Sequence, residues 1–229
     1  MAQLKKKYFG NLSGRFGDAV FRQIGDKNYI AQRPAKYKVP ETQEFRDRIT
    51  RFGLSAKLAK SVYGTPDLQT FWKREYPEEN RLFNFILQAN YPFMNPDGIS
   101  ANPMIAPDEN GFGARLDSHS ISDNSVRADI APLGSSSGID TSVETRIRLI
   151  SIILLAEPLD VNYPGFHLFT LKSEEQILSL NDPLRFDIQL SGNQAEKVAR
   201  YQQRKALFSL ITSDDNGNLF RYSSTFYSS

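Results

Sequence analysis

The most informative segment of this chain reads Thr145-Arg146-Ile147-Arg148-Leu149-Ile150-Ser151-Ile152-Ile153-Leu154-Leu155-Ala156. Residues 145–149 alternate polar and apolar side chains, as does a strand with one solvent face. Residues 150–155 are almost continuously apolar, as in a strand that is covered on both faces. The apolar run is far shorter than the roughly 20 residues that a membrane helix needs. The segment therefore predicts a buried β-strand.

Strand patterns continue on both sides of this segment, divided by turn residues. Asp214-Asp215-Asn216-Gly217 lies between two of them and predicts a hairpin. So many short strands in about 105 residues favour an antiparallel β-sandwich of immunoglobulin-like size over 126–229. The predicted strands are Val126–Ile130, Ser142–Ala156, His167–Leu171, Leu184–Leu190, Arg204–Ser213 and Leu219–Tyr227.

Helical patterns precede the strands. Thr42 can cap a helix over 43–63, and two further helices are expected over 67–75 and 78–90. The first helix carries apolar residues at spacings of 4, 3, 4, 3 and 4, which predicts one buried stripe along it. Its members are Phe45, Ile49, Phe52, Ala56, Ala59 and Tyr63.

The first 40 residues read as β structure. Residues 18–24 and 29–33 are separated by the turn residues 25–28, so they predict a β-hairpin. Since a lone two-stranded hairpin is marginal in water, this one must pack on something else. Residues 92–125 are rich in proline and glycine, so they are expected to be an irregular connector. It joins a basic hairpin arm and helical region (1–91) to the β-sandwich (126–229). The expected fold class is α+β.

Composition excludes several kinds of site. The 229 residues contain no Cys, so no disulfide, thiolate metal site or cysteine nucleophile can form. The N-terminus has basic residues without a following apolar segment, and no secretory signal is expected.

Charge is unevenly distributed along the chain. Residues 1–60 hold 14 basic and 5 acidic residues, a net of +9, which leaves 14 basic and 21 acidic residues, a net of −7, for 61–229. Such asymmetry suggests an arm that contacts an anionic partner, either nucleic acid or the acidic part of a neighbouring subunit. The simpler alternative is that these basic residues have no partner and only keep the surface of a hairpin and a helix in contact with water. The predicted partner-binding residues are Lys5, Lys6, Lys7, Arg15, Arg22, Lys27, Arg33, Lys36 and Lys38.

Motifs for catalysis, metals or cofactors are weak. Gly134-Ser135-Ser136-Ser137-Gly138 matches G-x-S-x-G, but its Ser/Gly composition favours a loop over a nucleophile elbow. His119 is expected in a loop and His167 at a strand edge, hydrogen-bonded to a neighbour. Asp214-Asp215-Asn216-Gly217 lacks the spacing of a calcium loop. No catalytic residue, metal ligand or cofactor is predicted.

The N-terminal segment resembles a known but uncharacterised family. Gly10-Asn11-Leu12-Ser13-Gly14-Arg15-Phe16-Gly17-Asp18-Ala19-Val20-Phe21, followed by Gly25-Asp26-Lys27-Asn28-Tyr29 and Arg33-Pro34, is similar to the G-x-x-S-G-x-x-G-x-x-V-F opening of a family common in Bacteroidota. That family ends in a β-rich half with a serine-rich last strand, as in Tyr222–Tyr227. The resemblance implies the architecture and no activity.

These features together favour a non-catalytic structural or interaction protein. We expect a subunit of a homo-oligomeric assembly, such as a phage particle or filament, located in the cytoplasm or a virion, without a membrane or small-molecule substrate. The alternative is a nucleic-acid-associated protein that binds phosphates through residues 1–60. A third hypothesis, a hydrolase with unrecognised carboxylates, requires a deep pocket with clustered Asp or Glu.

Overall fold

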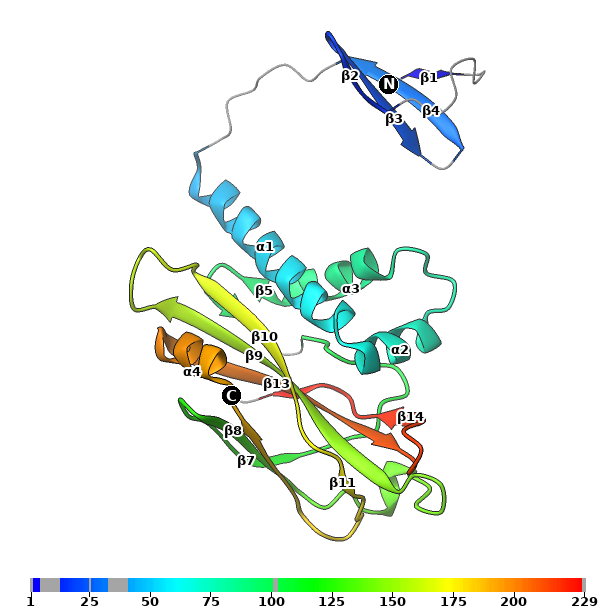
Figure 1. The fold of residues 1–229 in the computed structure, drawn as a ribbon, viewed down its shortest axis with the longest axis vertical. Coiled ribbons are helices and arrows are strands. Elements are labelled where there is room, and N and C mark those ends of the chain that lie inside the picture. Colours follow the sequence, from blue (N-terminus) through cyan, green and yellow to red (C-terminus); the bar gives the residue numbers. More distant parts are fainter. Residues whose placement is uncertain (1, 5–12, 25, 33–40, 101–102, 228–229) are drawn as a thin grey trace. The chain divides into compact units, whose positions relative to one another are not determined.

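The structure is a computed structural model that describes residues 2–4, 13–24, 26–32, 41–100 and 103–227. The chain separates into two compact units, Met1–Thr42 and Gln43–Ser229 (Figure 1).

The first unit is an antiparallel sheet with the strand order β1-β4-β3-β2. The strands are β1 (Ala2–Leu4), β2 (Gly14–Phe16), β3 (Ala19–Ile24) and β4 (Lys27–Gln32). The predicted hairpin is β3–β4, and two further strands extend it. Phe16 pairs with Ala19, so Gly17 and Asp18 form a two-residue turn, for which Gly17 adopts a φ of 56°.

The second unit begins with helices. They are α1 (Gln43–Tyr63), α2 (Pro66–Glu75) and α3 (Leu82–Asn90), followed by the 3-10 turn η1 (Tyr91–Phe93) and the short strands β5 (Met94–Asn95) and β6 (Gly98–Ile99). Among the described residues, no helix has the length and apolar character needed to cross a membrane.

Two antiparallel sheets follow. One has the order β10-β9-β13-β14, with β11 on β9 and β15 on β13, and the other has the order β12-β8-β7. The predicted hairpin at 214–217 joins β13 to β14, as expected. The remaining elements are β7 (Leu116–Ile121), β8 (Ser125–Ile130), η2 (Ser135–Ser137), β9 (Arg146–Pro158), β10 (Phe166–Lys172), β11 (Gln176–Ile177), β12 (Leu184–Gln189), α4 (Gly192–Ala199), β13 (Tyr201–Ser213), β14 (Leu219–Tyr222) and β15 (Phe226–Tyr227).

The larger sheet is the middle layer of the second unit, with α1–α3 on one face and the β12-β8-β7 sheet on the other (Figure 1). Leu149 and Ile153 of β9 face the smaller sheet and belong to the inner core, which also contains Val126 and Phe208. Ile152 and Leu154 face the helices and belong to the helical core. This arrangement confirms a fold of helices and antiparallel sheets, and it explains the continuous apolar run, because both faces of β9 are covered.

The predicted stripe of α1 is wrong in phase, although one of its members, Ala59, is buried. Its buried residues are Leu54, Ser55, Leu58, Ala59 and Val62, whereas Ile49 and Phe52 of the predicted stripe are each 55% exposed. Small Ser55 and Ala59 let the helix approach its neighbours, and Ser55 Oγ donates to the Leu87 carbonyl of α3 at 2.7 Å. The residues through which a helix packs on its neighbours need not be the largest apolar residues of that helix.

The division of the chain also differs from the expected one. It falls after Thr42, and α1–α3 share the helical core with β9 and β13. Part of the expected connector 92–125 is buried: Ile105 lies in the helical core, and its carbonyl accepts a 3.0 Å hydrogen bond from Trp72 Nε1. Proline and glycine indicate turns, and turns can still carry buried side chains.

Candidate functional site

The N-terminal sheet presents two chemically different faces. Side chains of directly paired residues lie on the same face of an antiparallel sheet, and neighbours along a strand alternate. The pairs Arg15–Val20, Arg22–Tyr29 and Ile24–Lys27 therefore share one face. It carries the three described members of the predicted basic set, all exposed. The other members, Lys5, Lys6, Lys7, Arg33, Lys36 and Lys38, lie outside the described residues.

The opposite face, termed the apolar face, carries the large apolar side chains Phe16, Phe21 and Ile30 beside the polar residues Gln23, Asn28 and Gln32. Phe21 pairs with Ile30, and Phe16 with Ala19, which places these side chains together with Asn28. Phe16 is 81% exposed, and Phe21 and Ile30 are half-buried. Asn28 is the one buried residue among residues 13–24, 26–32, 41 and 42. Phe16 is therefore a large apolar side chain left open on this face.

Carboxylates gather elsewhere, at the end of α2. Burial, and after it the charges of Glu109, Glu75 and Asp108, raises the pKa of the Tyr76 hydroxyl. Each of the three carboxylates therefore acts on the Tyr76 hydroxyl. Arg74 lies 3.6 Å from Glu75, and Asn110 Nδ2 donates to the same carboxylate at 2.8 Å. This acidic corner belongs to the second unit, as the negative charge of 61–229 predicts.

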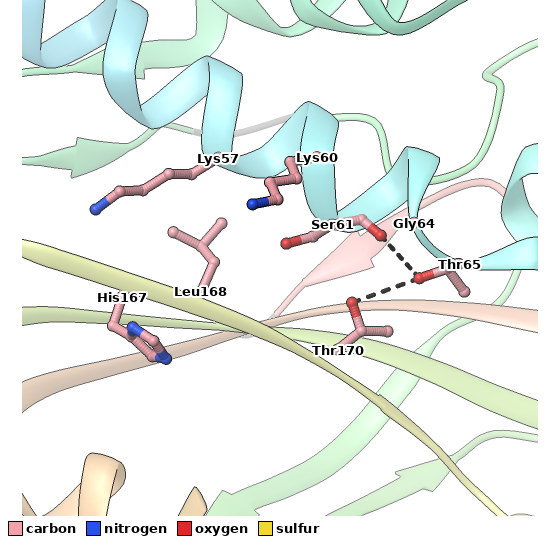
Figure 2. A pocket seen from close by; sticks show the side chains of 8 residues that line it. All are labelled: Lys57, Lys60, Ser61, Gly64, Thr65, His167, Leu168 and Thr170. Carbon is pink, nitrogen blue, oxygen red and sulfur yellow. Dashed lines mark hydrogen bonds between the residues drawn. The ribbon is translucent and has the colours of Figure 1, made fainter.

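A cleft of about 440 Å³ lies between α1 and β10. Figure 2 shows Lys57, Lys60 and Ser61 reaching from α1 toward β10, and Leu168 reaching from β10 toward the helix. Thr65, just after α1, donates through Oγ1 to the Ser61 carbonyl at 2.8 Å. Gly64, His167 and Thr170 complete the lining.

Lys57 connects α1 to β10 at this cleft through a hydrogen bond. Its Nζ donates to the Phe166 carbonyl at 2.6 Å. β10 is the outer strand of the sheet, so every second backbone carbonyl of β10 points away from β9 and has no strand partner. Lys57 donates to one of these carbonyls. Burial lowers the pKa of Lys57.

His167 lies on the other side of β10. Its strand partner is Leu155, an inner-core residue, so the imidazole points away from α1. Burial, followed by the charges of Lys197 and Lys57, lowers the pKa of His167. Its Nε2 is buried and has no partner among the described residues, contrary to the expected hydrogen bond.

The remaining predicted motifs are not brought into a reactive arrangement. His119 lies in strand β7, not in a loop, and its ring centroid is 6.5 Å from that of Phe208. Ser135–Ser137 form a 3-10 turn in which Ser137 Oγ donates to the Gly134 carbonyl. Within the described residues, no three His, Asp or Glu side chains are grouped as metal ligands.

The sequence contains one signal for the cleft that the motif search missed. Lys57, Lys60 and Ser61 lie three and four residues apart, which places them on one face of α1, and Gly64 follows directly after the helix. The strand opposite them begins about 100 residues later, so helical spacing alone could not show that the face lines a cleft.

The chain matches no family model, and searches of curated proteins and of solved structures found no match either. The resemblance to the Bacteroidota family therefore stays a prediction.

Proposed function

We propose that this chain is a non-catalytic structural protein that assembles with further copies of itself through its N-terminal sheet. The apolar face of that sheet carries the proposal. Phe16 is 81% exposed on it, and Asn28 is the one buried residue among residues 13–24, 26–32, 41 and 42. A small sheet gains stability by packing an apolar face on another surface, and a neighbouring copy can supply that surface.

Charge supports a head-to-tail arrangement of the copies. The acidic corner at Glu75, Asp108 and Glu109 is complementary to the basic N-terminal segment, so one copy's sheet would lie on the next copy's second unit. A contact between two different surfaces leads to rings or open filaments. As part of the same proposal, the protein is a subunit of a virion or a filament, located in the cytoplasm or in the virion.

Sedimentation velocity of the full chain over a concentration series tests this assembly. We expect species larger than the monomer, reduced by Phe16→Ser and by salt near ~0.5 M, because screening weakens exposed charge pairs. Val161→Ser is the control, since Val161 is 95% exposed and lies outside the N-terminal sheet. A monodisperse monomer at every salt and concentration would reject the proposal.

The basic face of the N-terminal sheet supports a second candidate, nucleic-acid binding. Arg15, Arg22 and Lys27 lie on that face with the ring of Tyr29, a combination that can pair with phosphates and stack on bases. Replacing all three cations by Ala should weaken the salt dependence of the affinity for duplex DNA. In a plot of the logarithm of the binding constant against the logarithm of the salt concentration, the slope should become shallower by about 0.9 for each phosphate that is no longer neutralised. Arg185→Ala, in the second unit and largely exposed, is the control. Absence of DNA binding at low salt would remove this candidate.

We also propose the immunoglobulin-like sandwich for the β-rich part. Its support is the inner core, which two antiparallel sheets enclose.

A further inference from the structure

We propose that the cleft between α1 and β10 binds the phosphate group of a small phosphorylated molecule. This site is independent of the assembly proposed above and departs from the expectation of a protein without small-molecule ligands. It rests on the shape of the cleft, its donors and the lack of acidic side chains in its lining.

The cleft has the size and chemistry of a ligand site. Its volume of about 440 Å³ lies within the range of about 300–1,000 Å³ typical of small-molecule pockets and exceeds what one phosphate ion fills. Leu168 supplies an apolar wall, while Ser61, Thr65 and Thr170 supply hydroxyl groups. A phosphate at the lysine end would leave room for the organic part of the molecule.

Donors remain available in this cleft. Lys60 Nζ makes no hydrogen bond or ion pair with another described residue, and neither does Ser61 Oγ. Lys57 Nζ donates to the Phe166 carbonyl, which leaves two of its three N–H groups for a ligand. Thr170 Oγ1 lies 3.5 Å from Thr65 Oγ1, a long contact for two hydroxyl groups, so the Thr170 hydroxyl can turn toward a ligand.

No acidic side chain is among the residues that line the cleft. Asp67 follows Thr65 by two residues, but it pairs with Lys172 at 2.9 Å and Arg148 at 3.4 Å. The charges that act on His167, on the other side of β10, come from Lys197 and Lys57, both positive. Neighbouring cations without a counterion attract an anion from solution.

Phosphate fits this donor set better than a carboxylate does. A phosphate monoester carries a charge of about −1.5 to −2 at pH 7 and three strong acceptor oxygens. Two ammonium groups can balance that charge, and a serine hydroxyl can donate to a third oxygen. A phosphodiester carries one charge and would leave one lysine uncompensated.

Calorimetric titration of the full chain with inorganic phosphate and glycerol 3-phosphate tests the site, against chloride at equal ionic strength. We expect both to bind, and Lys60→Met and Lys57→Met each to weaken binding about tenfold, as removal of one hydrogen bond to a charged group does. Lys73→Met is the matched control, because Lys73 is an exposed lysine of α2 that bonds to Gln69. No binding beyond chloride, or an equal weakening with Lys73→Met, would overturn the proposal.

Two further measurements sharpen the result. In proton NMR, bound phosphate near Lys57 should raise the pH at which His167 titrates, because the anion offsets the lysine charges beside it. A thymidine oligonucleotide should not compete with glycerol 3-phosphate. If only the oligonucleotide binds, the cleft is part of a nucleic-acid surface and the small-molecule proposal is wrong. Unshifted His167 despite binding would place the phosphate elsewhere and overturn the assignment to this cleft.

Discussion

The two units of this chain are both rich in antiparallel strands, yet they bury their side chains very differently. Among residues 13–24, 26–32, 41 and 42, Asn28 alone is buried, while β9 of the second unit has ten consecutive buried residues, Ile147–Ala156. The difference comes from layering, since β9 has helices on one face and a sheet on the other. Strand pairing supplies the hydrogen bonds of a unit, and covered faces supply most of its hydrophobic stabilisation.

The largest expected effect comes from separating the units at Thr42. The 43–229 fragment should keep its native circular dichroism spectrum, because the described residues of both cores all lie within it. A 1–42 peptide should show little β structure at micromolar concentration, since so short a sheet without a core is marginal. A folded, monomeric peptide would contradict the contrast between the two units.

Next in size is the contrast between the two faces of α1. Leu58→Ala should lower the free energy of unfolding by about 2–5 kcal/mol, because Leu58 is fully buried in the helical core. Phe52→Ala should change it by no more than about 0.5 kcal/mol, since Phe52 is 55% exposed. Urea unfolding followed by the fluorescence of Trp72, the single tryptophan, measures both. Equal decreases in the free energy of unfolding for the two variants would contradict this contrast and support the apolar stripe expected from helical periodicity.

A decrease of similar or smaller size is expected at the ion pairs that join α2 to the large sheet. Arg148, 8% exposed on β9, contacts Asp67 and Glu175. Arg148→Met should cost about 3 kcal/mol, because it leaves partly buried carboxylates with fewer partners. Arg127→Met should cost at most about 1 kcal/mol, since the Arg127–Asp187 pair is exposed. The same urea series measures both, and a neutral Arg148→Met would show that the network adds no stability.

The smallest effect concerns acid stability at the β13–β14 turn. Hydrogen bonds from Asn218, and further ones from Asn216, hold the pKa of Asp214 below its usual value. A carboxyl with a lowered folded pKa stabilises the protein above its unfolded pKa of about 4, and this stability disappears as the pH falls through the folded pKa. Asp214→Asn should therefore flatten the decline of Tm below about pH 4. A decline parallel to that of the unsubstituted protein would contradict this assignment.

Sequence periodicity predicted the elements better than it predicted their partners. The run at 150–155 indicated a strand covered on both faces, and the 214–217 turn indicated its hairpin, because both signals are local. The stripe of α1 was wrong because that helix carries apolar residues on two faces, and only the position of the sheet decides that Leu54, Leu58 and Val62 are the buried ones. The basic residues were identified from composition, but their shared face follows from strand register.

The pairing of β9 with β13 has a consequence for how this chain folds. The two strands are paired from Arg146–Ser213 to Pro158–Tyr201, and side chains of both contribute to each core. Neither core can be completed before these strands meet, although about 40 residues separate them along the chain. Closing so long a loop makes folding slow, and it couples the helical layer to the smaller sheet in one cooperative transition. The helices and the smaller sheet should therefore unfold together, although they do not share a core.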